Sequence, residues 1–298
     1  MIPITESDNP KTSDIDKVST LEAVRLINSE DKLVAEAVEK VLSHVAVAID
    51  RIVERLENGG RLFYIGTGTS GRLGVLDASE IPPTYGVSYD LVQGVIAGGY
   101  DALYKATESS EDNSEQAAED LKARGLTAND AVIGIAASGR TPYTIGAVRY
   151  ARELGCFTAC IVCNPDSKIT HEVDVAIIPV VGPEPITGST RMKAGTAQKL
   201  ILNMISTVAM IRLGYVHGNR MTNMKASNEK LQDRAVRILM EEARLGEAQA
   251  AQLMSEAGGD LRVALVMSKA STDRRSAEHS LKEVMDVVDK AVELSKSK

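Results

Sequence analysis

Two stretches rich in glycine and hydroxyl groups stand out in the chain, and each follows a short apolar run. The run 61–65 leads into the loop 66–71 (Gly-Thr-Gly-Thr-Ser-Gly), and the run 131–136 leads into the loop 137–142 (Ala-Ser-Gly-Arg-Thr-Pro). A helical pattern follows each loop at once. A strand, a tight glycine turn and a helix N-terminus together form an anion site, because free backbone N–H groups and the helix dipole both favour negative charge. Two such loops predict one phosphate held from two sides.

The first loop also spells Gly-x-Gly-x-x-Gly, a spacing found in dinucleotide-binding folds. Such a site needs an acidic residue about 20 residues later, at the end of the second strand. Asp90 falls in that window, but it lies inside the expected strand 87–92 rather than after it. The second hydroxyl-rich loop favours a phosphomonoester instead, with the hydroxyls of Thr67, Thr69 and Ser70 as donors.

A third cluster of glycines and hydroxyls occupies residues 182–199 and adds two cations, Arg191 and Lys193. It precedes a long apolar helix expected over about 195–213. From the residues alone, a second substrate-binding segment and a polar linker with a helix N-cap explain it equally well.

Composition narrows the classes of function. With 298 residues, the chain has room for one large α/β domain and a smaller one. A net charge of −7 and the absence of Trp argue against nucleic acid and against base stacking. The N-terminal residues lack the apolar segment of a signal peptide, and no apolar run is long enough to cross a bilayer. We therefore expect a cytoplasmic protein with no membrane partner.

Three cysteines, Cys156, Cys160 and Cys163, lie in one strand-like segment. An odd number without paired spacing fits a reducing cytoplasm. Successive positions on a strand point to opposite faces and offer no tetrahedral set, so we interpret them as buried small residues and expect no metal.

The order of elements predicts the fold class. An arm over 1–20 and helices over 20–27 and 31–56 precede the first loop, and the helix after that loop is expected to end near Ser79, before Pro82-Pro83. Apolar runs alternating with helices predict a doubly wound, flavodoxin-like parallel sheet with helices on both faces. The expected strands are 61–65, 87–92, 131–136, 157–163 and 174–178.

Past Asn219 the pattern changes to short amphipathic helices, which predicts a small helical C-terminal domain. The expected division is an N-terminal arm with helices over 1–50, a phosphosugar-binding domain over 51–220 and a helical tail over 221–298.

The two loops resemble the sugar-isomerase (SIS) family of phosphosugar-binding domains over about residues 50–220. The segment 182–199 is similar to the signature shared by N-acetylmuramic acid 6-phosphate etherases and the glucokinase regulatory protein. Three further strings, at 77–86, 135–143 and 227–231, resemble the bacterial etherase family. The tail resembles that family's ubiquitin-associated-like (UBA-like) domain.

The resemblance implies a homodimer without a cofactor that cleaves the D-lactyl ether of N-acetylmuramic acid 6-phosphate. The products would be N-acetylglucosamine 6-phosphate and D-lactate, in the recycling of peptidoglycan amino sugars. Glu80 and Glu111 match the family's catalytic pair. The residues that match its phosphosugar loops are Ser70, Ser138 and Thr141, with the backbone of Gly71 and Gly139; Ser189, Thr190 and Lys193 are further candidates for the sugar or its phosphate.

The chemistry needs only two carboxylates. In the open-chain sugar C1 is an aldehyde, which makes the C2 proton acidic, so elimination of the C3 ether is easier than direct hydrolysis. Glu80, expected at the carboxyl end of its helix and beside apolar residues, suits an acid. Glu111, expected just before a helix that begins near Ser114, suits a base. The alternative for Glu111 is a solvated charge in an acidic linker.

Other interpretations stay open at this point. A sugar-phosphate isomerase would share the fold and the C2 proton abstraction without releasing lactate, and a sensor would bind the phosphosugar without turnover. A nicotinamide enzyme is a third possibility. Arg72 and Arg140 are candidates for structural pairs with acids such as Asp77, and His217 for a helix cap or a neighbouring site.

Overall fold

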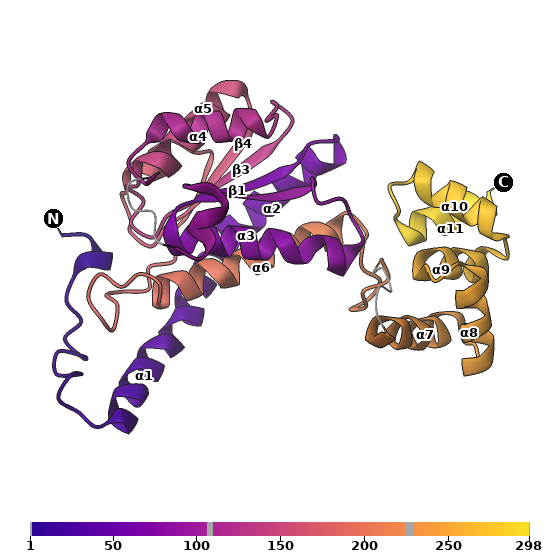
Figure 1. Ribbon diagram of the computed structural model, residues 1–298, viewed down its shortest axis with the longest axis horizontal. Coiled ribbons are helices and arrows are strands. Elements are labelled where there is room, and N and C mark those ends of the chain that lie inside the picture. Colours follow the sequence, from indigo (N-terminus) through magenta and orange to yellow (C-terminus); the bar gives the residue numbers. More distant parts are fainter. Residues whose placement is uncertain (1, 106–109, 224–228, 298) are drawn as a thin grey trace. The chain divides into compact units, whose positions relative to one another are not determined.

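The structure is a computed structural model that describes residues 2–105, 110–223 and 229–297 (Figure 1). The chain divides into two compact units, which are described one at a time. The first comprises Met1–Ser79 and Tyr89–Thr207, and the second comprises Glu80–Ser88 and Val208–Lys298. Among the described residues, no helix is long and apolar enough to cross a membrane.

The first unit is built on a five-stranded parallel sheet in the order β2-β1-β3-β4-β5. This is the flavodoxin-like order of a doubly wound sheet and confirms the predicted fold class. The strands are β1 (Leu62–Gly66), β2 (Val92–Ile96), β3 (Ala131–Ile135), β4 (Phe157–Ile161) and β5 (Val175–Ile177).

Helices cover both faces of this sheet (Figure 1). Phe63 and Ile65 of β1 pack with residues of α4 (Ser114–Ala123) and α5 (Pro142–Leu154) in one core cluster. Tyr64 points to the opposite face, where Gly74 of α3 (Gly68–Tyr85) approaches so closely that a Cβ would lie 2.9 Å from the Cβ of Tyr64.

Several expected boundaries are wrong. The second strand is Val92–Ile96 rather than 87–92. The sequence pattern did not indicate this strand, because it contains Gly94 and glycine is a poor strand former. A side chain there would collide with α3, since a Cβ would lie 2.5 Å from the Cα of Val75.

The helix after the first loop does not end near Ser79 but continues through both prolines to Tyr85. Each proline removes a backbone hydrogen bond. Burial of Ile81, Pro82 and Tyr85 outweighs this loss, and Gly86 ends the helix in a left-handed conformation (φ +67°).

The N-terminal helices also differ from the prediction. One helix, α1 (Thr20–Glu39), spans the expected break near residue 30, and α2 (Leu42–Glu57) follows it. Glu30 is buried in α1 and pairs with Lys193, so the polar residues around it do not interrupt the helix. The expected arm contains a short 3-10 helix, η1 (Ile4–Glu6), and docks on the first unit through buried Thr5, Asn9 and Thr12.

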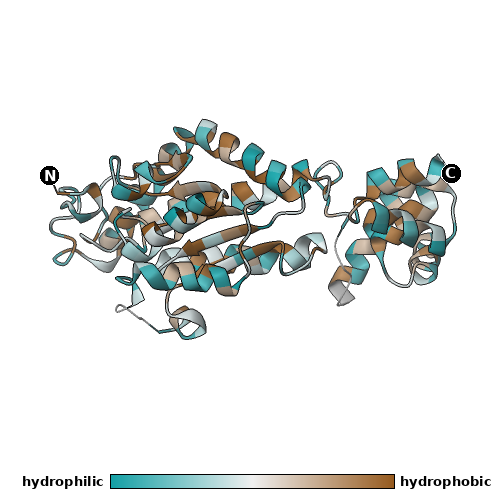
Figure 2. Cartoon of the chain, turned by 90° about the horizontal axis from the view of Figure 1, so that it is seen from above, coloured by the Kyte–Doolittle hydropathy of each residue, from teal (hydrophilic) through white to brown (hydrophobic). Residues whose placement is uncertain are grey.

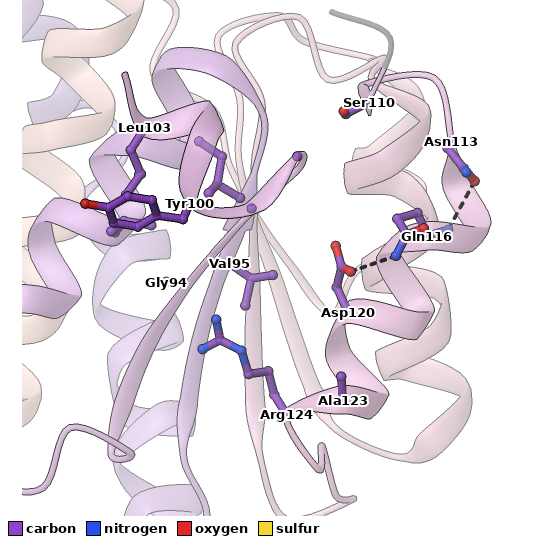
Figure 3. A pocket seen from close by; sticks show the side chains of 14 residues that line it. Gly94, Val95, Tyr100, Leu103, Ser110, Asn113, Gln116, Asp120, Ala123 and Arg124 are labelled. Atoms are coloured by element: carbon purple, nitrogen blue, oxygen red, sulfur yellow. Dashed lines mark hydrogen bonds between the residues drawn. The ribbon is translucent and has the colours of Figure 1, made fainter. Parts of the chain in front are cut away.

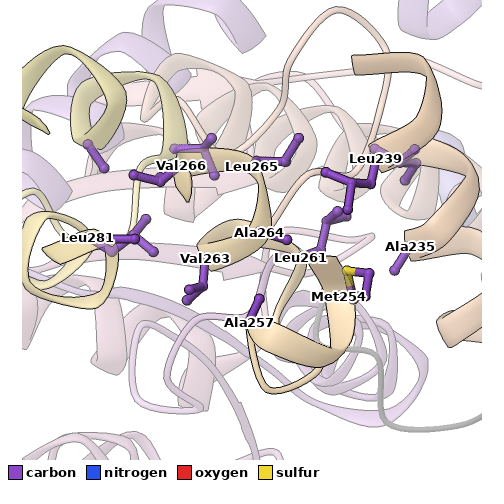
Figure 4. Packing of buried hydrophobic residues seen from close by; sticks show 14 of the residues in the cluster. Ala235, Leu239, Met254, Ala257, Leu261, Val263, Ala264, Leu265, Val266 and Leu281 are labelled. Carbon is purple, nitrogen blue, oxygen red and sulfur yellow. The ribbon is translucent and has the colours of Figure 1, made fainter. Parts of the chain in front are cut away.

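The second unit has a helical core of its own (Figure 4). Its helices carry stripes of hydrophobic and hydrophilic residues (Figure 2), as amphipathic helices packed on a core do. Leu239, Met254, Leu261, Leu265 and Leu281 lie in the buried cluster. The helices are α7 (Glu229–Ala243), α8 (Glu247–Glu256), α9 (Leu261–Ala270), α10 (Arg274–Glu283) and α11 (Val288–Lys296).

Candidate functional site

The two glycine- and hydroxyl-rich loops leave the same edge of the sheet from neighbouring strands. Gly66 of β1 lies opposite Ile135 of β3, and each strand ends at or beside that position. From there the chain winds through α3 to β2 on one side and through α5 to β4 on the other. This reversal is the topological switch point, where ligands bind in doubly wound folds.

The first loop is the amino-terminal turn of α3, which begins at Gly68. Gly68 has φ +48°, and the first bond of the turn runs from the N–H of Gly71 to the carbonyl of Thr67. The N–H groups that start a helix have no partner within it and are available to an anion. Gly71 lets this turn sit tightly on the strands, because a Cβ there would lie 2.7 Å from the carbonyl oxygen of Gly66.

The second loop is fixed by the segment that follows β4. The Oγ of Ser138 accepts a hydrogen bond from the N–H of Arg140, and its carbonyl accepts one from Nδ2 of Asn164. Gly139 has φ +65°, and a Cβ there would lie 2.2 Å from the Oγ of Ser167. Thr141 is half-buried at the start of α5.

The N-terminal arm supports the second loop through Asn164. Nδ2 of this buried residue donates to the Oγ1 of Thr5, and its Oδ1 accepts from the N–H of Thr5. Sequence reasoning missed Asn164 and Ser167, because their partners are distant in the chain and neither belongs to a loop motif.

Glu111 lies between the two loops. A Cβ on Gly68 would be 3.4 Å from Oε1 of Glu111, which places this carboxylate beside the first turn of α3. The carbonyl of Glu111 accepts a hydrogen bond from the N–H of Tyr143, in the first turn of α5. Glu111 is half-buried as a residue, and α4 begins at Ser114 as predicted. Glu111 is therefore positioned against the first loop rather than free in a solvated linker.

Glu80 lies elsewhere on α3. It is exposed, and the helix carries it twelve residues past Gly68, about 18 Å along the axis at the usual rise per residue. The sequence predicted that Glu80 lies at the carboxyl end of its helix. This prediction is wrong, because α3 continues to Tyr85. More than three turns of α3 therefore separate Glu80 from Gly68.

The third cluster, residues 182–199, forms the turn before α6 and the first two turns of α6 (Lys193–Arg212). The buried carboxylate of Glu184 accepts hydrogen bonds from the N–H groups of Lys193 and Ala194. Burial nevertheless raises the pKa of Glu184 above its usual value, because desolvation outweighs these bonds. Nζ of Lys193 is 2.7 Å from Oε2 of Glu30, so this predicted substrate residue forms a buried ion pair. Ser189 and Thr190 are half-buried in the preceding turn.

The amino-terminal part of α6 lies against the first loop. The Oγ of Ser70 donates to Oε1 of Gln198 at 2.9 Å, and a Cβ on Gly195 would lie 3.4 Å from Cγ2 of Thr69. Gln198 was not among the predicted site residues. Its place in the third cluster was the only signal that could have indicated it.

Further along α3, Asp77 forms a buried polar network. Its Oδ1 accepts hydrogen bonds from Asn203 and Ser206 of α6. Burial raises the pKa of Asp77, and these hydrogen bonds only partly oppose that effect. Arg72 does not pair with Asp77; its guanidinium donates to the carbonyls of Leu103 and Lys105.

The candidates that remain outside the two loops are His217, the three cysteines and Asp90. The ring of His217 lies 3.0 Å from a carboxylate oxygen of Asp289 in the second unit. The three cysteines are buried, and burial raises the pKa of the Cys156 thiol to about 11 and those of Cys160 and Cys163 to about 12. Asp90 precedes β2 at the amino edge of the sheet, opposite the loops, so it cannot serve as the acidic residue of a dinucleotide site.

A cavity of about 680 Å³ lies beside the site, between β2 and α4 (Figure 3). Tyr100, Gln116, Asp120 and Arg124 contribute to its wall, and Ser110, the neighbour of Glu111, stands at one end. Gln116 donates a hydrogen bond to Asp120, one turn further along α4.

The fold and the paired loops define this protein as one with an SIS domain. Residues 111–208 match the SIS domain family, and residues 44–152 match the glucokinase regulatory protein N-terminal SIS domain. The chain belongs to the N-acetylmuramic acid 6-phosphate etherase family. It is 54% identical to the etherase of Clostridium botulinum (strain Langeland) over 95% of this chain and 92% of that one. It is 59% identical to the etherase of Symbiobacterium thermophilum over 88% and 87% of the two chains.

Solved structures agree on the fold. A putative phosphosugar isomerase from Bacteroides fragilis aligns with a TM-score of 0.51 at 22% identity, over 67% of this chain and 95% of that one. The c3406 protein of E. coli CFT073, solved as a complex, aligns with a TM-score of 0.50 at 16% identity, over 68% and 97%.

Proposed function

We propose that this protein cleaves the D-lactyl ether of N-acetylmuramic acid 6-phosphate and releases N-acetylglucosamine 6-phosphate and D-lactate. The relatives that carry the etherase name span nearly the whole chain. The observation that supports the chemistry is the position of Glu111 at the switch point of the sheet, where its carboxylate lies beside Gly68 and its backbone carbonyl accepts a hydrogen bond from the N–H of Tyr143 in α5. We place the reaction in the cytoplasm, in the recycling of peptidoglycan amino sugars.

The phosphate is expected to lie between the two loops. Backbone N–H groups in the first turn of α3 and hydroxyls of Thr69 and Ser70 would bind it from one side. Ser138 and Thr141, with the backbone at Gly139, would bind it from the other. Ser189 and Thr190 in the turn before α6 are further candidates for the sugar, whereas the ammonium of Lys193 is engaged by Glu30.

The proposed reaction proceeds in two halves. The carboxylate of Glu111 takes the C2 proton of the open-chain aldehyde, and the C3–oxygen bond breaks with its electron pair leaving on lactate. An acid, Glu80, protonates that oxygen. Water then adds to C3 of the unsaturated aldehyde, and C2 regains a proton, which gives the open-chain form of N-acetylglucosamine 6-phosphate.

Glu80 would act on the site of a second copy. Along α3 it lies about 18 Å from Gly68, where Glu111 rests, so one chain does not bring the two carboxylates together through this helix. A symmetric homodimer would place the α3 of one copy against the loops of the other and complete both sites. We also propose that residues 221–298 form a UBA-like helical tail. In the dimer, this tail would cover the site of the partner.

Mixing two inactive variants tests this arrangement. If each site combines Glu111 of one copy with Glu80 of the other, a heterodimer of Glu80→Gln and Glu111→Gln chains contains one intact site. Random exchange of subunits would then restore about a quarter of the wild-type activity, because half the dimers are mixed and each has one working site. No recovery, with exchange verified by mass spectrometry, would place both carboxylates in one chain.

The reaction itself is tested by incubating the protein with N-acetylmuramic acid 6-phosphate in water enriched in heavy oxygen. Lactate release with the label on the sugar is expected for elimination followed by addition of water at C3. Label in the lactate would mean that the ether is cut on its other side. Conversion of the phosphosugar without lactate would indicate an isomerase, and binding without any conversion would indicate a sensor.

A further inference from the structure

Ser70 and Gln198 form a buried hydroxyl–carboxamide pair at the first loop. The Oγ of Ser70, a residue 8% exposed in the first turn of α3, donates to Oε1 of Gln198 at 2.9 Å. Gln198 lies in the second turn of α6 and is 1% exposed. Among the described residues, its Nε2 has no hydrogen-bond partner.

This arrangement is unsuited to phosphate binding. A serine hydroxyl carries one proton and two acceptor lone pairs, and the oxygens of a phosphate dianion only accept. While Ser70 gives its proton to Gln198, it has none for the ligand. The same pair leaves two amide protons of Gln198 buried and unused, which is unfavourable for stability.

Rotation of the carboxamide about its last bond frees the Ser70 proton and gives one of the two amide protons an acceptor. The torsion that ends a glutamine side chain is broad and roughly two-fold, so Oε1 and Nε2 can exchange places with little movement. Nε2 would then donate to a lone pair of Ser70, and the hydroxyl proton would turn toward the phosphate. We infer that Gln198 is a positioning residue for phosphosugar binding, which acts by setting the direction of the Ser70 proton. The inference rests on the proposed function in taking the ligand to be a phosphosugar and Ser70 to bind its phosphate.

Two substitutions of similar size separate this role from simple packing. Glu in place of Gln198 (Gln198→Glu) can only accept at neutral pH, so it would hold the Ser70 proton permanently. Gln198→Met removes the partner and leaves the hydroxyl free to turn. We expect the affinity for N-acetylglucosamine 6-phosphate, measured by calorimetry, to fall about tenfold to a hundredfold in Gln198→Glu and markedly less in Gln198→Met.

A double-mutant cycle with Ser70→Ala removes the effect of the added charge. If Gln198 acts through Ser70, Gln198→Glu should cost little further affinity in the Ser70→Ala background. An undiminished penalty there would mean that the new carboxylate simply repels the phosphate, and the inference would be wrong. Equal affinity of wild type and Gln198→Glu would also overturn it. Thermal unfolding of each variant checks that the fold is retained.

The outcome is separable from that of the proposed function. Binding is measured with N-acetylglucosamine 6-phosphate and with unphosphorylated N-acetylglucosamine, so no turnover is needed. Wild-type protein that binds the phosphosugar and depends on Gln198 but releases no lactate would refute the etherase reaction and leave the inference standing. Wild-type protein that binds neither sugar would overturn the inference.

Discussion

Nζ of Lys193 lies 2.7 Å from Oε2 of Glu30, and the two side chains are 1% and 4% exposed. The pair joins α1 to the first residue of α6 across 163 positions of sequence. Asn9 also donates to Oε2 of Glu30, and Lys11 donates to Oε1, so the carboxylate is satisfied on both oxygens. A lysine in a segment that is similar to a phosphosugar signature thus fastens the N-terminal helices to the domain.

Breaking this pair should destabilise the protein strongly. Removal of one partner of a buried ion pair leaves an uncompensated charge and costs about 3–5 kcal/mol. We therefore expect Lys193→Met and Glu30→Gln each to lower the free energy of unfolding by about that much, measured in urea. The double variant should recover part of the loss. If Lys193→Met instead leaves stability unchanged and weakens only phosphosugar binding, the residue belongs to the substrate site.

The same carboxylate predicts a pH dependence of stability. Burial alone would raise the pKa of Glu30, but hydrogen bonds from Lys193, Lys11 and Asn9 outweigh it and lower the pKa to about 2 from its usual 4.5. A carboxylate whose pKa is lower in the folded than in the unfolded state stabilises the fold. This stabilisation is complete above the unfolded pKa and is lost as the pH falls from about 4.5 toward 2. The stability difference between wild type and Glu30→Gln should therefore shrink over that window. A difference that stays constant down to about pH 3 would contradict the prediction.

Glu111→Gln should remove most of the activity without removing the ligand. Gln keeps the size of the side chain but cannot accept a proton, and a positioned general base contributes about 10²–10⁴ in rate. We expect lactate release to fall by that factor, with little loss of affinity for N-acetylglucosamine 6-phosphate. Glu115→Gln is the matched control, because Glu115 is exposed on the first turn of α4. Equal losses in both variants would argue for an effect of charge on the whole acidic segment.

Much of the first unit was predictable because its signals are local. Apolar runs followed at once by glycine turns and helical patterns marked β1 and β3, and the switch point between them follows from strand order. The second strand was misplaced because the reason for Gly94 is its contact with Val75 on another element, which no local pattern contains. The helix boundary at Pro82 was misplaced because tertiary burial overrode a local rule.

The site was predictable to the extent that its residues lie in the loops. The sequence predicted the hydroxyls of both loops as ligands, and family resemblance predicted Glu111, whose carboxylate lies beside Gly68 in the structure. Gln198, Asn164 and the pairing of Lys193 were not, because each depends on a partner far away in the sequence. Polar residues in one segment look alike in sequence, whether they contact a ligand or another part of the chain.

The last prediction concerns Gly86, the residue that follows α3, and its contact with Asn223 within the second unit. It has φ +67°, and a Cβ there would lie 2.3 Å from the carbonyl oxygen of Asn223. Nδ2 of Asn223 donates to the carbonyl of Asp286, so the backbone oxygen has little freedom to withdraw.

Gly259 offers the matched control in the same unit, because its φ is +79° and, among the described residues, nothing lies within 4 Å of a Cβ placed there. An alanine in the left-handed region costs about 1–2 kcal/mol wherever it stands. Gly259→Ala should therefore lose about that much stability, whereas Gly86→Ala should lose a further 1–3 kcal/mol or so through overpacking. Thermal unfolding of the two variants compares the losses directly. If they are equal, the end of α3 does not pack against Asn223 in solution.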